Sequence, residues 1–444
     1  MDTLIGVFLV LGVMILVHEW GHFIVARLFG VRVDVFSIGF GPRLFGFKRG
    51  ATDYRISALP LGGYVRMAGQ DLSEVDSSNV APTGAHDELM SKARWKRALI
   101  SFAGPAVNLI MPIVLFAGFY TIKGMPYPAY LDKPLIISSL PKESTLAKAG
   151  IGDGDRVVAI NDVTTPNWAA ANTVLLQTPP DGMLRFSIDH QGTNQTVEVK
   201  VKDLKNMDRP LGNYPAPALV GQVEPGKPAS RSGLKRGDLI LSVNGTPVGN
   251  WPEFFDLIRH SNGQVLNIVV RRKGGDLNLA IHPVQDKDES GQVAWRIGVT
   301  QGGEWAFRKI GFTASVAEAS SETFEATGKL LGVIGKLFSG RLSVRQLQSF
   351  VGIAVQAGQA VQEGPVDVIN MMAMISLNLG ILNLLPIPIL DGGNILLLSM
   401  EGIRRRDFSM AFKERFIQVG LVFLLVLFVF VMYNDVARLL TSHS

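Results

Sequence analysis

The feature that most constrains this chain is an apolar stretch near its start that carries ionisable side chains. Residues 13–30 read VMILVHEWGHFIVARLFG and place His18, Glu19 and His22 where a membrane helix is expected. Ionisable groups are costly in a bilayer and mark function by default. Four residues apart on a helix, the two imidazoles can bind one metal ion, with Glu19 as general base. A purely structural polar cluster is the alternative, but hydrocarbon offers it no partners.

Four segments are long and apolar enough to cross a membrane. They lie within residues 1–30, 98–122, 366–393 and 416–440. The composition agrees, since 47% of the 444 residues are hydrophobic and only 18% are charged. The first segment has no basic residue before it and no small-residue cleavage pattern after it, so we expect an uncleaved span instead of a signal peptide. The sequence therefore predicts a polytopic α-helical membrane protein with four transmembrane helices.

Basic residues are concentrated in two connections between these spans, residues 31–97 and residues 394–415. In a four-span protein both connections lie on one side, and the positive-inside rule makes that side cytoplasmic. Both termini and the long connection 123–365 are then expected on the periplasmic side. The net charge of +5 is not gathered into a long basic run, so no nucleic-acid partner is expected. The absence of cysteine excludes disulfides and cysteine-ligated metals.

The long connection contains an internal repeat. Residues 147–162 (AKAGIGDGDRVVAIND) align with residues 230–245 (SRSGLKRGDLILSVNG) at one offset. Each copy is typical of a short helix, a Gly-Asp turn and a strand, followed by a helix and further strands. The pattern resembles tandem PDZ domains, here two extracytoplasmic α+β domains at residues 128–215 and 216–302. The resemblance implies that they bind peptide tails by strand addition. A β-rich spacer, or a body that only excludes bulky substrates, is the alternative.

Two more segments have a recognisable pattern. Residues 303–365 are predicted as an amphipathic helical region that lies on the outer membrane face or packs against the PDZ-like pair. Residues 33–67 alternate as short strands with glycines at the bends, among them Gly39 and Gly41. We expect a membrane-associated β-sheet there, whose edge can pair with an extended substrate. A hairpin that only supports the metal-binding helix is the alternative.

A third metal ligand is expected near the end of the third span, because catalytic zinc takes three protein ligands and a water. Residues 383–393 read NLLPIPILDGG and lie on the same side of the membrane as the two histidines. Pro386 and Pro388 should break the helix, and the two following glycines should permit unusual backbone. Such backbone occurs at membrane depth only inside protein or against a wet cavity. Asp391 is the candidate ligand, and a plain turn aspartate is the alternative.

HEWGH, GPAVN in the second span, the tandem repeat and NLLPIPILDGG together resemble the site-2 protease family of intramembrane zinc metalloproteases. The four-span layout with two outer PDZ-like units is similar to the bacterial regulator-of-sigma-E branch of that family. The resemblance implies one Zn²⁺ per chain, bound by His18, His22 and Asp391, with Glu19 as the catalytic acid and base. It also implies that Asn383 binds substrate. Further candidates for substrate binding are Gly39, Gly41 and Asn108.

The resemblance further implies an enzyme of the bacterial inner membrane with its active site toward the cytoplasm. Its substrates would be single-span membrane proteins, above all an anti-sigma factor in envelope-stress signalling. Two departures are Asn394, where many relatives have His, and LQSF at residues 347–350, where relatives often have Leu-Ser-Gly-Pro. A non-catalytic PDZ membrane scaffold and a metal transporter are the competing hypotheses. Glu19 discriminates against both, because neither needs a general base between two histidines.

Overall fold

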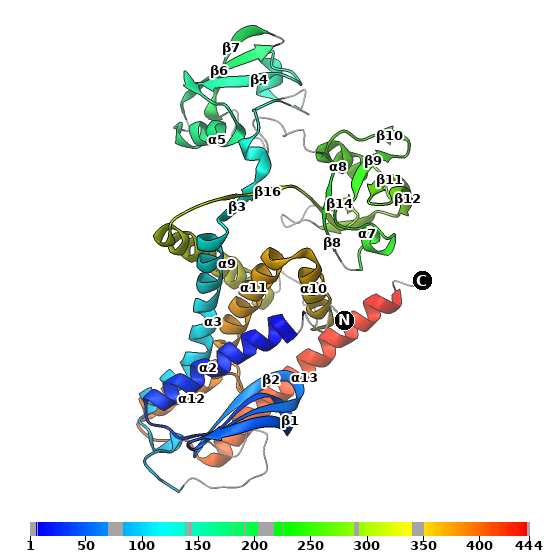
Figure 1. The fold of residues 1–444 in the computed structure, drawn as a ribbon. Helices are drawn as coiled ribbons and strands as arrows, with labels where there is room; N and C mark the ends of the chain where they lie inside the picture. Colours follow the sequence, from blue (N-terminus) through cyan, green and yellow to red (C-terminus); the bar gives the residue numbers. More distant parts are fainter. Residues whose placement is uncertain are drawn as a thin grey trace. The chain divides into compact units, whose positions relative to one another are not determined.

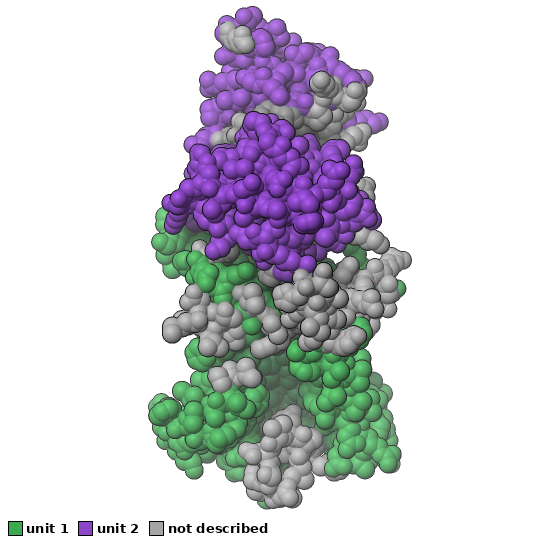
Figure 2. Space-filling view, turned by 90° about the vertical axis from the view of Figure 1, so that its right-hand side faces the viewer, with its two compact units in different colours: residues 1–125, 309–444 green, residues 126–308 purple. Residues whose placement is uncertain are grey.

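The computed structural model describes residues 6, 8–69, 83–137, 140, 144–179, 181–190, 192–202, 217–224, 226–287, 293–339 and 350–441. The chain forms two compact units, which are described separately here (Figures 1 and 2). The helical unit comprises residues 1–125 and 309–444, and the repeat unit comprises residues 126–308.

The helical unit is built mainly from helices that differ widely in length. They are η1 (Phe8–Gly12), α2 (Val13–Leu28), η2 (Leu89–Ser91), α3 (Arg94–Ile122), α9 (Phe312–Phe338), α10 (Phe350–Glu363), α11 (Pro365–Asn383), α12 (Asp391–Arg404) and α13 (Met410–Thr441). Three stretches of the described residues are long and apolar enough to cross a membrane, namely Val10–Leu28, Arg94–Ile122 and Pro365–Asn383. They correspond to the first three predicted spans. The fourth predicted span is helical, as α13, and its passage through a membrane stays a prediction.

The three apolar helices pack through small residues. A Cβ on Gly21 of α2 would lie 2.6 Å from the carbonyl oxygen of Ala103 on α3. A Cβ on Gly380 of α11 would lie 3.1 Å from a backbone oxygen of α3. Ser376 of α11 also donates a hydrogen bond of 2.9 Å to the carbonyl oxygen of Asn108. Because small residues let apolar helices approach closely, α3 contacts both α2 and α11 along its length.

The third span differs from the predicted one. The sequence predicts a span over residues 366–393 and a connection over residues 394–415. In the structure α11 ends at Asn383, and a second helix, α12, begins at Asp391 and fills most of the predicted connection. The candidate ligand therefore starts a new helix instead of ending a span.

The break between α11 and α12 has a clear cause in its residues. Pro386 and Pro388 lie in this break, as predicted, and remove backbone donors that a continuous helix would use. The unusual backbone, however, lies at Ile389, whose φ is 81°. The glycines that follow are helical and serve close packing. A Cβ on Gly392 or Gly393 would lie 2.3 or 2.2 Å from backbone oxygens of the break.

The predicted β-sheet is formed by two long antiparallel strands, β1 (Val33–Arg49) and β2 (Thr52–Met67). Both strands bend, so that Phe36 of β1 is paired with Val65 on one arm of β2 and with Tyr54 on the other. Five large apolar side chains on the sheet are at least 49% exposed, namely Leu44, Phe45, Phe47, Ile56 and Leu59. An exposed apolar surface of this kind supports the predicted association with a membrane.

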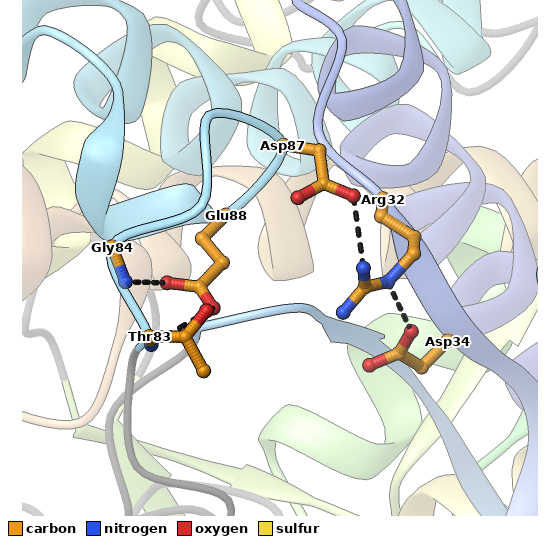
Figure 3. Close-up of polar contacts among 6 residues, drawn as sticks. All are labelled: Arg32, Asp34, Thr83, Gly84, Asp87 and Glu88. Atoms are coloured by element: carbon orange, nitrogen blue, oxygen red, sulfur yellow. Dashed lines mark hydrogen bonds and ion pairs between the residues drawn. The ribbon is translucent and has the colours of Figure 1, made fainter.

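A polar cluster ties the segment before α3 to the start of β1 (Figure 3). Arg32 donates hydrogen bonds to Asp34 at 3.0 Å and to Asp87 at 2.9 Å. Glu88 accepts hydrogen bonds from the amide of Thr83 at 3.0 Å and from its hydroxyl at 2.6 Å. These hydrogen bonds hold the pKa of Glu88 below its ordinary value, because they favour the ionised carboxylate.

The repeat unit contains two sheets with the same strand order, β5-β4-β6-β7 and β10-β9-β11-β12. The first copy consists of β4 (Arg156–Ile160), β5 (Val163–Thr164), α5 (Trp168–Gln177), β6 (Met183–His190) and β7 (Thr193–Lys200). The second consists of β9 (Leu239–Val243), β10 (Thr246–Pro247), α8 (Trp251–Arg259), β11 (Leu266–Arg272) and β12 (Gly275–Ile281). Shorter elements complete the unit, namely β3 (Met125–Pro128), η3 (Ala129–Asp132), α4 (Thr145–Lys148), β8 (Val220–Val223), α7 (Pro228–Arg231), β13 (Val284–Lys287), β14 (Val293–Arg296), β15 (Val299–Gln301) and β16 (Trp305–Arg308).

Matching residues of the two copies make matching hydrogen bonds. Asn167 and Asn250 cap α5 and α8 by accepting from the amide three residues later. Asp155 and Asp238 each accept from the amide three residues earlier. Each copy also has its own apolar core. The internal repeat is therefore a structural duplication, and its identity as a PDZ pair that binds peptide tails stays a prediction.

The predicted helical region 303–365 begins later than expected. Trp305–Arg308 form strand β16, which pairs with β3, so these residues are not helical. The apolar side chains that suggested a helix there also suit a strand. Residues 312–338 and 350–363 of the region are helical, as α9 and α10. Residues 347–349 of the LQSF departure lie outside the described residues.

Candidate metal centre

Helix α2 holds His18 and His22 on one buried face, as their spacing predicts. His18 is 6% exposed and His22 is 9% exposed. Their Nε2 atoms lie 3.2 Å apart, and the rings meet edge to face. A Cβ on Gly104 of α3 would lie 2.3 Å from Nε2 of His22. Only glycine at this position therefore leaves room for the second imidazole beneath α3.

Asp391 reaches the two histidines from the first turn of α12. Its Oδ2 lies 3.2 Å from Nε2 of His18 and 3.5 Å from Nε2 of His22. The three candidate ligand atoms all lie within 4.8 Å of one another. The preceding break makes this possible, since Ile389 adopts a φ of 81° that costs a β-branched residue energy and is usual only at constrained sites. The structure thus brings the three predicted ligands together.

The proton on His22 is placed by a backbone group. Its Nδ1 lies 2.8 Å from the carbonyl oxygen of Ile100, which can only accept a hydrogen bond. In the neutral ring Nδ1 therefore carries the proton, and Nε2 keeps its lone pair toward Asp391. A metal-binding histidine usually donates its outer N–H to such an acceptor.

Asn108 is the hydrogen-bond partner of Nδ1 of His18, as the carbonyl oxygen of Ile100 is for His22. Its amide nitrogen lies 3.2 Å from Nδ1 of His18, while its fully buried Oδ1 has no hydrogen-bond partner in the described residues. A half turn of the carboxamide keeps its shape and brings Oδ1 to Nδ1–H, which satisfies both groups. His18, like His22, then offers an unprotonated Nε2. Two imidazole nitrogens and one carboxylate oxygen form a donor set that fits zinc.

The other candidate residues lie in different surroundings. Asn383, at the end of α11, places its amide nitrogen 3.3 Å from Nε2 of His18. Asn108 is completely buried behind His18, so its position favours orienting that ring over contacting a substrate. Gly39 and Gly41 lie in β1 with φ values of 90° and 86°, where glycine bends the strand without strain.

The sheet approaches the site at Glu19. A Cβ on Gly63 of β2 would lie 3.3 Å from Cγ of Glu19. Gly63 belongs to the arm of β2 that ends at Met67 and pairs with β1. One edge of the sheet therefore passes directly beside the candidate general base.

Three positions of the site escape sequence reasoning, namely Gly63, Ile100 and Gly104. Gly104 is part of GPAVN, and a small residue in a span could have indicated close helix packing. Ile100 contributes only a carbonyl group, which every residue has, so no sequence signal marks it. Gly63 lies beside Glu19 only because β2 bends, and the sequence does not show the direction of that bend.

Comparison with known proteins gives matches over nearly the whole chain. The sequence model of peptidase family M50 matches residues 6–427. The regulator of sigma-E protease RseP of Escherichia coli (strain K12) is 32% identical over 450 aligned residues, which cover 97% of each chain. Protease RseP of Yersinia pestis is 31% identical, again over 97% of each chain. A Neisseria meningitidis protein, named as a candidate zinc metalloprotease, is 30% identical over 99% of this chain and 100% of its own. This chain therefore belongs to peptidase family M50, the site-2 protease family of zinc metalloproteases.

Proposed function

We propose that this protein is an intramembrane protease whose single zinc ion is held by His18, His22 and Asp391. The observation that carries the proposal is the meeting of their three ligand atoms within 4.8 Å. Two nitrogens and one carboxylate oxygen leave a fourth position open for water or substrate, as catalytic zinc requires. Zinc, when bound, supplies a Lewis acid that activates water and polarises the scissile carbonyl group.

Glu19 is the proposed general base and acid. It follows His18 on α2, and its side chain lies beside Gly63 at the sheet. In this position it can take a proton from the attacking water and return it to the leaving amine. Asn383 is the proposed substrate-binding residue, since its amide can donate a hydrogen bond to the substrate's carbonyl oxygen.

The substrate is proposed to bind as an extended strand along the arm of β2 that contains Gly63. A helix shields its peptide bonds, so a transmembrane substrate must unwind before it is cut. Within the described sheet this arm pairs with β1 along one side, and a strand added along its other side would pass Glu19. Strand addition supplies backbone hydrogen bonds without a demand for one particular sequence.

The substrates are proposed to be single-span membrane proteins of the bacterial inner membrane, an anti-sigma factor among them. The Escherichia coli relative, which is named as a regulator of sigma-E protease, supports this, because it aligns over nearly the whole chain. The basic connections support an active site toward the cytoplasm, with both termini and the PDZ-like domains in the periplasm. Those domains are proposed to receive peptide tails.

Measurement of zinc content and of cleavage on the same purified protein tests the proposal. Glu19→Gln is expected to keep one zinc per chain and to lose cleavage of a model single-span substrate by at least about a hundredfold, because it removes the base and no ligand. His22→Phe and Asp391→Ala are expected to lower zinc content. Wild-type cleavage by Glu19→Gln would refute the protease mechanism. Full zinc occupancy in both ligand variants would refute the ligand set. A metal transporter would instead move zinc into vesicles regardless of Glu19.

A further inference from the structure

A second polar site lies away from the metal centre, at the end of α3 where its apolar stretch begins. A cavity of about 610 Å³ opens between this end and α12. Arg97 lines it together with Lys92, Arg94 and Trp95. Asp407, which follows α12 in the sequence, also belongs to the lining. Neither the proposed catalytic residues nor the sheet takes part in this cavity.

Arg97 is the unusual member of this group. It is only 9% exposed, and its guanidinium makes no hydrogen bond with any residue that the structure describes, although its charge interacts with Asp407 in the same cavity. A guanidinium carries five donors and stays charged at every physiological pH. A largely buried guanidinium whose donors are not filled favours a ligand that accepts hydrogen bonds from it.

The carboxylates near the cavity are already engaged. Asp407 accepts hydrogen bonds from Arg94 at 2.9 and 2.7 Å. Glu401 is completely buried and lies 3.3 Å from Lys413. Asp407 also interacts with the charge of Arg97, so the cavity lining holds one carboxylate against three cations, Lys92, Arg94 and Arg97. The cavity therefore favours an anion.

The start of α3 adds to this preference. Ala93 precedes the helix and offers no side-chain cap to its first amides. The free amides of a helix start carry partial positive charge and attract anions. Trp95 is 58% exposed beside them, and tryptophan is enriched at the level of lipid headgroups. The cavity thus lies where the hydrocarbon-spanning part of α3 meets the polar interface.

We propose that this cavity binds the phosphate group of an anionic phospholipid, with Arg97 as its central contact and Lys92 at its rim. Basic sites between membrane helices at the interface are a known way of holding lipid headgroups. A lipid bound here bridges α3 to α12, the helix that begins with Asp391. It would hold the two helices together from the end opposite the metal ligand.

The test uses the full chain purified in a maltoside detergent, which contains no phosphate. Phosphatidylglycerol is titrated in, and bound lipid is counted by native mass spectrometry while the melting temperature is followed. We expect wild type to retain the lipid and to melt at a higher temperature with it. Arg97→Met should bind it about tenfold or more weakly, because charge-assisted hydrogen bonds are lost. Without lipid, Arg97→Met should melt close to wild type, since the guanidinium makes no hydrogen bond with the described residues and Asp407 keeps its hydrogen bonds from Arg94.

Two further variants keep the result interpretable. Arg415→Met removes an exposed charge on α13 outside the cavity, and it should keep the wild-type response. Lys92→Met changes a partly exposed residue at the rim of the cavity, and it should weaken binding about threefold. Wild-type lipid binding by both cavity variants would overturn the proposal. A full response to inorganic phosphate alone would overturn the assignment to lipid.

Discussion

The substitution Gly104→Ala tests whether the packing of α3 creates the metal centre. A Cβ at this position would lie 2.3 Å from Nε2 of His22, and 2.7 and 2.8 Å from two ring carbons. Nonbonded atoms need about 3.5 Å, so the imidazole must move by about 1 Å. It cannot do so freely, because Nδ1 is bonded to the carbonyl oxygen of Ile100 and the ring rests against His18.

The expected loss of zinc affinity follows from that displacement. Metal–ligand distances tolerate only about 0.2 Å, so a shift of about 1 Å removes His22 from the coordination sphere or breaks its bond to Ile100. Loss of a supporting bond alone lowers metal affinity about 10- to 100-fold. Displacement of the ligand atom itself should cost at least 100-fold, or about 3 kcal/mol.

The assay is competition for zinc between the purified variant and a chelator of known affinity. Gly118→Ala is the matched control, since it lies on the same helix and a Cβ there meets nothing within 4 Å. Both variants gain up to about 1 kcal/mol of helix propensity, so this effect cancels in the comparison. Wild-type zinc affinity in Gly104→Ala would refute the reasoning, provided that the variant elutes as a folded protein.

Three other predictions follow from the structure. Asn108→Ala should lower zinc affinity about tenfold in chelator competition, because Asn108 orients His18. Asn383→Ala should keep its zinc and raise the KM for substrate in a kinetic assay. The reverse pattern would exchange the two roles. Because the folded-state pKa of Glu88 lies below its ordinary 4.5, its stabilisation is present above that pH and is lost as the pH falls through the lowered value. The melting temperatures of wild type and Glu88→Gln should therefore differ at pH 7 and converge in acid; a constant difference would contradict this. Single cysteines at Arg406 and Asn194, in a chain without its own cysteine, should react from opposite faces of intact membranes, and labelling from one face would contradict the orientation.

Much of the architecture could be predicted because its signals are local. Runs of apolar residues identify the first three helices, and the repeated Gly-Asp turns identify the two sheets, since each pattern is complete within a few dozen residues. The errors lie where an apolar run suits two structures. Trp305–Arg308 form a strand because they pair with the edge of β3. Since β3 lies about 180 residues earlier in the chain, the local sequence of residues 305–308 gives no sign of this pairing.

The amino-acid sequence alone determined which chemistry this protein can perform. His18, Glu19 and His22 share a helix whose spacing places both imidazoles on one face, and the two prolines before Asp391 favour a break in the helix. Only the tertiary structure decided how these groups are used. The carbonyl group of Ile100, the amide of Asn108 and the edge at Gly63 reach them through packing of α3, α12 and β2. The burial of Arg97 in a cavity with more cations than carboxylates is likewise invisible in the sequence, because burial is a property of the packed chain.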